Sequence, residues 1–285
     1  MIARIVFIFG MALALQAQPK FEVVSIKLCK DPKGEQAGDV EASGTRFSMK
    51  CYSADRMIRE AYRLYASGVP WPKNPLTRAM SYPMPPGLMF TPLQASTGWT
   101  KSELYTIVAK ADRPAAPEMM RGPMMQKVLE DRFHLKLRRE KKEIKVFELV
   151  VAKGATPKLK AAEPGGCFAP TPESGPPSGK QAICGGFRRV ESGGVDVRGV
   201  TMAELCTLFS LSAGRDVIDK TGLTGVYDIH LDVSLDQLHF GRSDDPAEAA
   251  AALAGALKKI GLGLQAGKLT VETLTIDHIE RPTEN

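Results

Sequence analysis

The sequence predicts an α+β fold made of two tandem pseudo-repeated two-layer α/β units, with helices packed on antiparallel or mixed sheets. Two observations indicate this fold class. Residues 201–232 change from helical to strand periodicity, and glycines mark the turns between the elements. The first half of the chain repeats this plan, so that each half is expected to have the order β-β-α-β-α-β-β.

The helix expected at the start of residues 201–232 has signals at both ends. Thr201 is a good N-cap, and Glu204 three residues later completes a capping box. Apolar residues then follow at helical spacing and define one buried face. Gly214 suits the position just after the helix, where a left-handed backbone favours glycine.

Strand signals follow this helix. Residues 217–219 are expected to form a short strand, and residues 221–225 have the composition of a turn. Residues 226–233 alternate, with Tyr227 and Ile229 on one face and Asp228 on the other. This alternation predicts a half-buried strand.

The same periodicities predict the remaining elements. Strands are expected over residues 21–28, 46–51, 103–111, 187–190 and 195–200. Helices are expected over residues 53–64, capped by Ser53, over 123–132, with Pro123 in the first turn, and over 246–260. One hairpin is expected over residues 134–139 and 144–151 around a charged turn, and another over residues 262–265 and 269–279.

Short matches relate the two halves, because Ser53 corresponds to Thr201 and Tyr105 to Tyr227 in the same element order. The expected domains are a signal peptide at 1–18, a first repeat at 19–160 with a proline-rich insertion at 66–101, a Pro/Gly-rich disulfide-closed linker at 161–186, and a second repeat at 187–285.

The N-terminus predicts export. Arg4 precedes an apolar run at residues 5–15, and small and polar residues follow at 14–18. This pattern is typical of a secretory signal peptide and is too short to span a bilayer. The expected location is periplasmic or extracellular. The net charge of +6 is mild, so export makes nucleic acid an improbable partner, whereas an anionic envelope surface is conceivable.

Five cysteines in an exported chain favour disulfides. Cys29 and Cys51 each end an expected strand and could meet across an antiparallel pair. Cys167 and Cys184 flank a Pro/Gly-rich loop with no core of its own. We therefore predict the bridges Cys29–Cys51 and Cys167–Cys184, with Cys206 as a buried free thiol. Metal ligation is disfavoured, because no CxxC or CxxH spacing exists.

Several motifs resemble one large family. They are residues 21–27 (FEVVSIK), 131–137 (DRFHLKL), 214–228 (GRDVIDKTGLTGVYD) and 276–285 (IDHIERPTEN). The chain is similar to the bacterial soil-associated secreted protein family, a domain of unknown function. It resembles more weakly the short N-terminal domain of secretins and TonB-dependent receptors.

This resemblance implies a sensing or binding role, since relatives occur alone or attached to sensor-type membrane peptidases. It transfers no catalytic residues, because the family has no established active site. The chain departs from the family pattern at Asp216, where proline is usual, and at Val233, where tryptophan is usual. The segment at residues 71–102 also looks longer than in the family.

No catalytic motif stands out in the sequence. His134, His230, His239 and His278 lie on separate expected elements without metal-ligand spacing. Asp277, His278 and Glu280 could form half of a metal or acid–base site, but a terminal strand with solvent-facing polar residues is the favoured interpretation. Ser210 and Ser212 lack a nucleophile elbow. We therefore predict no catalytic residue, no metal and no cofactor.

Two surfaces are candidates for binding. Residues 138–145 carry five basic side chains and could dock an anionic polymer, but a solvated hairpin tip is the favoured interpretation. The insertion is the stronger candidate, because prolines lower its ordering entropy and its aromatic rings offer apolar contact area. These rings are Trp71, Tyr82, Phe90 and Trp99, and they could equally pack the insertion onto its own domain.

Two functions are consistent with these features. The first is a secreted non-enzymatic binding or sensing module of the bacterial cell envelope, with an unknown protein or envelope ligand. The alternative is a secreted hydrolase with a dispersed active site. Asp277 and His278 clustered in a deep cleft would favour the enzyme. A shallow groove or an exposed sheet edge beside the insertion would favour the binding module.

Overall fold

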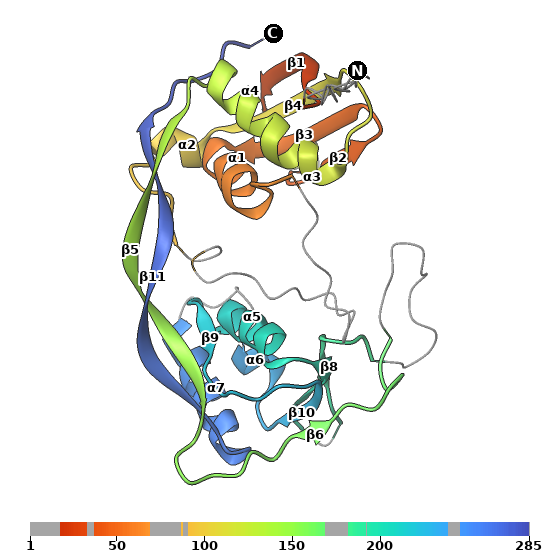
Figure 1. The fold of residues 1–285 in the computed structure, drawn as a ribbon, viewed down its shortest axis with the longest axis vertical. Helices are drawn as coiled ribbons and strands as arrows, with labels where there is room; N and C mark the ends of the chain where they lie inside the picture. Colours follow the sequence, from red (N-terminus) through yellow and green to blue (C-terminus); the bar gives the residue numbers. More distant parts are fainter. Residues whose placement is uncertain are drawn as a thin grey trace, which may run out of the picture. The chain divides into compact units, whose positions relative to one another are not determined.

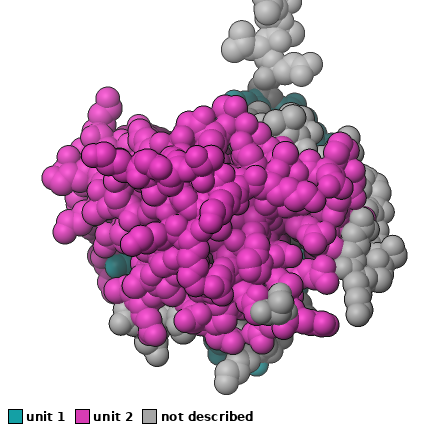
Figure 2. Space-filling view, turned by 90° about the horizontal axis from the view of Figure 1, so that it is seen from below, with its two compact units in different colours: residues 1–69, 99–133, 281–285 teal, residues 70–98, 134–280 magenta. Residues whose placement is uncertain are grey.

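A computed structural model describes residues 18–32, 37–68, 87, 91–168, 182–191, 193–238 and 246–284. The fold is α+β, and its described strands form three sheets (Figure 1). The chain divides into two compact units, coloured separately in Figure 2. Unit 1 comprises residues 1–69, 99–133 and 281–285, and unit 2 comprises residues 70–98 and 134–280. Each unit therefore draws on separate stretches of the sequence.

Unit 1 contains a four-stranded antiparallel sheet of order β1-β4-β3-β2. Ile26, Phe47 and Ile107 are buried on one face of this sheet, and helices α1 and α4 lie on that face (Figure 1). The residues between them along each strand point to the opposite face. The strands are β1 (Phe21–Leu28), β2 (Val40–Ser43), β3 (Arg46–Ser53) and β4 (Leu104–Ala111).

The first helix of unit 1 begins at the predicted cap but changes its geometry midway. Ser53 accepts a hydrogen bond from the backbone N–H of Arg56 at 3.3 Å. Helix α1 (Ala54–Arg59) then continues as a π-helical turn, η1 (Glu60–Leu64). A short helix inside the predicted insertion, α2 (Gly98–Ser102), was not expected from the sequence.

The predicted helix start at Pro123 is wrong. The helical run begins six residues earlier at Pro117 and passes through Pro123 in a π-helical turn. Proline cannot donate the usual backbone hydrogen bond, and the wider turn accommodates that loss. A kink lies at Gly122, where a Cβ atom would come within 1.8 Å of the Tyr65 carbonyl oxygen. The parts of the run are α3 (Pro117–Met119), η2 (Met120–Met124) and α4 (Met125–Arg132).

Unit 2 contains a second four-stranded antiparallel sheet, of order β6-β10-β8-β7. The predicted capping box is confirmed, since Glu204 N–H donates to Thr201 Oγ1 and Thr201 N–H donates to the Glu204 carboxylate. Gly214 ends the helix in the left-handed region, as predicted. The elements are β6 (Lys160–Ala161), β7 (Phe187–Arg189), β8 (Val195–Val200), α5 (Met202–Ala213), β10 (Tyr227–Leu231), α6 (Leu235–Leu238) and α7 (Pro246–Lys259).

The two predicted hairpins are each one continuous strand, so both hairpin predictions are wrong. β5 (Lys136–Val151) pairs with β11 (Leu262–His278) along almost its full length, as the long ribbon in Figure 1 shows. Charged side chains on an exposed ribbon hide the alternation by which strands are recognised. Residues 138–145 also lack glycine, proline, asparagine and aspartate, which is a sign against a turn. β9 (Val217–Asp219) adds to β5 in parallel.

The two four-stranded sheets share a local irregularity next to the helix that follows them. Cys51 and Gly199 each lie two residues before a helix N-cap, and both have a positive φ, of 52° and 59°. The Cys51 N–H donates to Thr106 Oγ1 at 3.3 Å, and the Gly199 N–H donates to Asp228 Oδ1 at 3.0 Å. A side chain of the neighbouring strand therefore binds the bulged backbone in both sheets.

The predicted disulfide pairing is confirmed. The bridges are Cys29–Cys51 and Cys167–Cys184. Cys206 is a buried free thiol on α5, and burial raises its pKa, so it is unreactive in the folded chain. Two disulfides indicate an oxidising compartment. No helix in the described part of the chain is long and apolar enough to cross a membrane.

Candidate functional site

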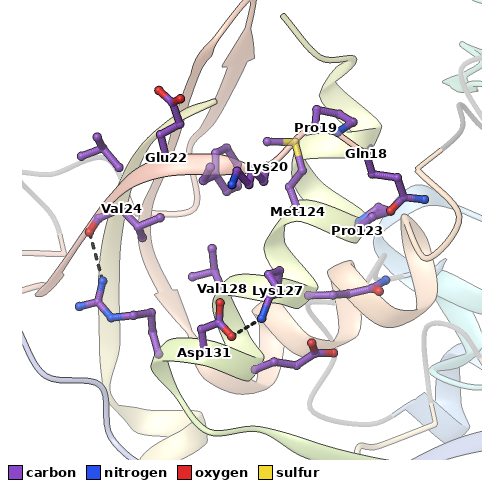
Figure 3. A pocket seen from close by; sticks show the side chains of 15 residues that line it. Gln18, Pro19, Lys20, Glu22, Val24, Pro123, Met124, Lys127, Val128 and Asp131 are labelled. Carbon is purple, nitrogen blue, oxygen red and sulfur yellow. Dashed lines mark hydrogen bonds and ion pairs between the residues drawn. The ribbon is translucent and has the colours of Figure 1, made fainter. Parts of the chain in front are cut away.

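A groove in unit 1 lies between the start of edge strand β1 and helix α4 (Figure 3), and we call it the β1–α4 groove. It encloses about 860 Å³, a size that suits a small-molecule or peptide ligand. Its lining mixes apolar and charged side chains. The lining residues are Gln18, Pro19, Lys20, Phe21, Glu22, Val23, Val24, Pro123, Met124, Gln126, Lys127, Val128, Glu130, Asp131 and Arg132.

The strand side of the groove is anchored to the neighbouring strand end. The Lys20 N–H donates to Asp112 Oδ1 at 3.1 Å, and the Asp112 N–H donates to the Lys20 carbonyl at 2.9 Å. A register shift between Phe21 and Val23 interrupts the pairing of β1 with β4. Such a bulge twists an edge strand away from regular pairing. We therefore expect a ligand to be held mainly by side chains and less by added strand pairing.

The apolar part of the groove belongs to the core of unit 1. The ring of Phe21 packs on the buried Phe47 with a centroid separation of 5.3 Å. On the helix side, Met124 is 3% exposed and Val128 is 5% exposed. These positions are largely fixed by packing, so the groove is preformed on rigid elements.

The four charged side chains on the helix side of the groove already interact with neighbouring groups. Lys127 and Asp131 form an ion pair and point toward each other in Figure 3, and this hydrogen bond raises the pKa of Lys127. Glu130 accepts a hydrogen bond from Tyr62 at 2.9 Å. Arg132 donates to the Val24 carbonyl at 3.2 Å, shown as a dashed line in Figure 3. The groove thus presents charge of both signs.

Arg132 also anchors the C-terminal tail, since it donates to the Thr283 carbonyl at 3.1 Å. The tail is tied a second time through Arg281, whose guanidinium makes hydrogen bonds of 2.7–3.0 Å with the Glu103 carboxylate. Those bonds lower the pKa of Glu103, and the hydrogen bond from Tyr105 adds to the effect. This cluster places the last residues of the chain in unit 1, next to the groove residue Arg132.

The predicted insertion starts beside this groove. A Cβ atom on Gly68 would lie 3.0 Å from the side chains of Pro123 and Met119. Gln126 of α4 donates to the carbonyls of Ala61 at 2.7 Å and of Ala66 at 3.2 Å. The chain therefore enters the insertion along the helix that forms one wall of the groove.

Only part of the predicted aromatic binding surface can be located. Trp71, Tyr82 and Phe90 lie outside the described residues. Trp99 is half-buried on α2, and the guanidinium of Arg281 stacks over its ring at 5.2 Å. Trp99 is not among the residues that line the β1–α4 groove.

The far end of the insertion packs on its own unit. Gln94 bridges Thr275 of β11 in parallel, and the Gln94 side chain accepts a hydrogen bond from Lys142 at 3.1 Å. A Cβ atom on Gly87 would come within 2.9 Å of Val271. Gly87 and Gln94 therefore pack on the β5–β11 ribbon, and these contacts do not involve the predicted aromatic rings.

The three described histidines are exposed and do not line the groove. His278 Nε2 lies 2.8 Å from Glu280 Oε1, and His134 Nε2 lies 4.0 Å from the other oxygen of Glu280. His230 pairs with Asp196 at 2.8 Å. His239 lies outside the described residues. In the described part of the chain, no three or more His, Cys, Asp or Glu side chains are arranged to hold a metal ion.

Residues 138–145, which were predicted to form a basic hairpin tip, carry charges that are paired across the β5–β11 ribbon. Arg139 forms an ion pair with Glu272 across the ribbon, and Lys268 pairs with Glu143 at 2.8 Å. Asp277, one of the acid–base candidates, pairs with Arg138 at 2.7 Å. The segment is therefore the middle of a strand whose charges are partly compensated across the ribbon.

Sequence reasoning missed the β1–α4 groove. Its two walls are about 100 residues apart in the chain, and each has an ordinary amphipathic pattern. The proline–methionine pair at Pro123 and Met124, inside a helix and beside an edge strand, is the one local hint. No sequence pattern indicates that the start of β1 and helix α4 lie side by side.

The comparisons with known proteins place the chain in a family. Residues 79–279 match the model of the family described as Protein of unknown function (DUF3738), and this match covers more than half of the chain. The chain belongs to that family. No curated protein and no solved structure matches it.

Proposed function

We propose that this protein is an exported, non-enzymatic binding module of the bacterial cell envelope and that the β1–α4 groove holds its ligand. The observation that carries the proposal is a preformed groove beside an edge strand and beside the start of the insertion. The mixed lining suits a ligand with apolar side groups and charges of both signs.

The distribution of titratable groups supports binding over hydrolysis. Asp277 and His278 lie exposed on β11 in unit 2, whereas the groove belongs to unit 1. In the groove, Lys127, Asp131 and Glu130 are already engaged in pairs that hold the helix surface. The secreted hydrolase remains the alternative, and its site would have to lie elsewhere.

Export and the finer family relation are part of the same proposal. The two disulfides are compatible with a periplasmic or extracellular location. Except for Gln18, the expected signal peptide falls on residues outside the described ones. The resemblance to soil-associated secreted proteins and to the secretin-type short domain supports a sensing or binding role.

We also propose that the two halves arose by duplication of one unit. The two sheets have matching orders, β1-β4-β3-β2 and β6-β10-β8-β7, and a capped helix follows the third and the eighth strand. The hydrogen bonds of Cys51 with Thr106 and of Gly199 with Asp228 support the same correspondence. Each half closes with one long strand, β5 or β11, after a helix.

A capture experiment with a matched control tests the groove. The exported chain serves as bait for envelope extract, beside the variants Lys127→Trp and Lys258→Trp. Lys127 lies in the groove and is 64% exposed, so its replacement fills the groove at a cost of about 1 kcal/mol or less in stability. Lys258 is an exposed helix lysine in unit 2.

We expect capture of the bound component to fall at least about tenfold with Lys127→Trp, since blocking a contact worth 1.4 kcal/mol has that effect. Lys258→Trp should bind like the wild type. Equal capture by all three proteins would overturn the assignment of the ligand to the groove.

A further inference from the structure

The open face of the unit 1 sheet, opposite α1 and α4, combines exposed valines with exposed cations. We call this surface the open sheet face and define it by Val23, Lys27, Arg46, Val108 and Lys110. Val23 is 61% exposed and Val108 is 52% exposed. Single exposed apolar residues are common, but apolar side chains that share one surface and are bordered by polar residues indicate an interaction site.

The strand register brings these residues together. Lys110 on β4 lies opposite Val23 on β1 and opposite Arg46 on β3. Val108 lies one step along the same face, between Ser25 and Ser48 on the neighbouring strands. The face therefore has a centre of small and apolar residues with cations beside it.

Arg46 and Lys110 are like charges placed directly opposite each other, an arrangement that destabilises a sheet. By the strand register Glu41 of β2 lies on the same face, opposite Ser48, and it forms an ion pair with Lys50 at 3.8 Å. Within the described residues, no acidic side chain forms an ion pair with Lys27, Arg46 or Lys110. An external anion would relieve this repulsion.

We propose that the open sheet face docks on an anionic lipid surface, with the cations near lipid phosphates and the two valines in the interfacial region. Charge complementarity calls for an anionic partner. The valines favour a lipid surface over a soluble polyanion, because a hydrophilic polymer offers them no apolar contact. This surface shares Val23 with the β1–α4 groove, whereas Lys27, Arg46, Val108 and Lys110 do not line the groove. It would hold the binding module at a membrane.

Vesicle flotation of the exported chain tests this proposal. The vesicles contain phosphatidylglycerol and phosphatidylcholine in equal parts, with pure phosphatidylcholine as the neutral comparison. We expect binding to the anionic vesicles only, weakening as salt is raised. The triple variant Lys27→Gln, Arg46→Gln, Lys110→Gln should bind about 100-fold more weakly, since each cation near such a surface contributes about fivefold.

The matched control removes the same charge from unit 2 through Lys141→Gln, Lys153→Gln and Lys158→Gln, all at exposed positions. Its binding should equal that of the wild type. An equal loss in both triple variants would show that net charge alone drives binding and would overturn the proposal, as would an absence of binding to anionic vesicles.

A second pair of measurements separates a lipid surface from a soluble polyanion. Val23→Ser with Val108→Ser should weaken vesicle binding about tenfold and leave binding to soluble polyglutamate unchanged. If polyglutamate binds as tightly as the vesicles and the valine variant has no effect on either, the lipid assignment is wrong. Thermal unfolding checks the fold of each variant, and relief of the Arg46–Lys110 repulsion should leave the triple variant at least as stable as the wild type.

Discussion

The helix that follows Ser53 in unit 1 and the helix that follows Thr201 in unit 2 begin alike but are stabilised differently. Helix α5 keeps regular α-helical geometry for twelve residues, and its Leu205 and Phe209 are fully buried. Helix α1 becomes a π-helical turn after six residues. The two helices therefore share an N-cap, but the geometry of the residues that follow depends on the elements that pack against each helix.

In unit 1, charged side chains join the two irregular turns in addition to the apolar packing of Met57 and Ile58. Glu60, at the start of the π-helical turn, pairs with Arg121 at 2.7 Å. The Arg121 guanidinium also lies 4.4 Å from the centre of the Tyr65 ring. Burial raises the pKa of Tyr65, in accord with a ring enclosed in this contact. The two irregular turns η1 and η2 thus meet through an ion pair and a close backbone approach at Gly122.

The largest expected effect comes from Gly122→Ala. The added methyl group would meet the Tyr65 carbonyl at 1.8 Å, and the kink has φ −100° and ψ −105°. We expect a loss of roughly 3 kcal/mol or more in the free energy of unfolding, measured by urea denaturation.

Gly255→Ala in α7 of unit 2 is the matched control, because open space surrounds that position. It should be neutral or stabilise by about 1 kcal/mol through helix propensity. A Gly122→Ala protein within about 1 kcal/mol of the wild type would show that the two turns do not depend on this close approach.

A smaller effect is expected from the half-buried ion pair. The side chains of Arg121 and Glu60 are 24% and 12% exposed. Arg121→Met should lower the free energy of unfolding by about 1.5 kcal/mol, because the partly buried Glu60 then loses its shortest ion pair. The loss is limited because Glu60 keeps its ion pair with Arg56 at 3.3 Å.

The exposed pair Lys259–Asp232 of unit 2 provides the comparison, since both side chains are more than 60% exposed. Lys259→Met should change the free energy of unfolding by about 0.5 kcal/mol or less. If Arg121→Met and Lys259→Met lower the free energy of unfolding equally, burial does not make the Glu60–Arg121 pair more important than the exposed Lys259–Asp232 pair.

The smallest expected effect is a pH dependence at the C-terminal tail. Hydrogen bonds from Arg281 and Tyr105 lower the pKa of Glu103 below its usual value of 4.5. A carboxyl with a lowered folded-state pKa stabilises fully above its unfolded pKa, and this contribution is lost as pH falls through the folded value. Glu103→Gln should therefore flatten the stability–pH curve below about pH 4.5.

Glu163→Gln in unit 2 is the control for this measurement. Lys160 lowers the pKa of Glu163, whose side chain is 73% exposed, whereas that of Glu103 is 28% exposed. The titration of Glu163 should therefore affect stability less than that of Glu103. Thermal unfolding followed from neutral to acidic pH measures both variants. A Glu103→Gln curve that parallels the wild type would mean that the tail contact does not contribute to folding.

Much of the local structure was predictable from the sequence. The capping box at Thr201 and Glu204, the end of that helix at Gly214 and the strand at residues 217–219 are as expected. Such signals act over a few residues, so a single sequence contains them in full. The long strands β5 and β11 were missed because their charges depend on cross-strand partners about 130 residues away.

The candidate site was less predictable than the fold. Trp99 was expected in a binding surface, but it lies under Arg281, whose partner Glu103 is 178 residues earlier in the chain. The β1–α4 groove joins residues from the beginning of unit 1 to a helix whose path depends on the kink at Gly122. Periodicity cannot indicate which distant elements meet.

The sequence by itself determined the α+β class, the caps, the short strands and the partners of four cysteines, because each follows from local backbone chemistry or from nearby strand ends. The tertiary structure alone decided the continuity of β5 and β11, the π-helical turns, the β1–α4 groove and the open sheet face. These features depend on contacts between segments far apart in the chain, where long-range packing overrides local propensity.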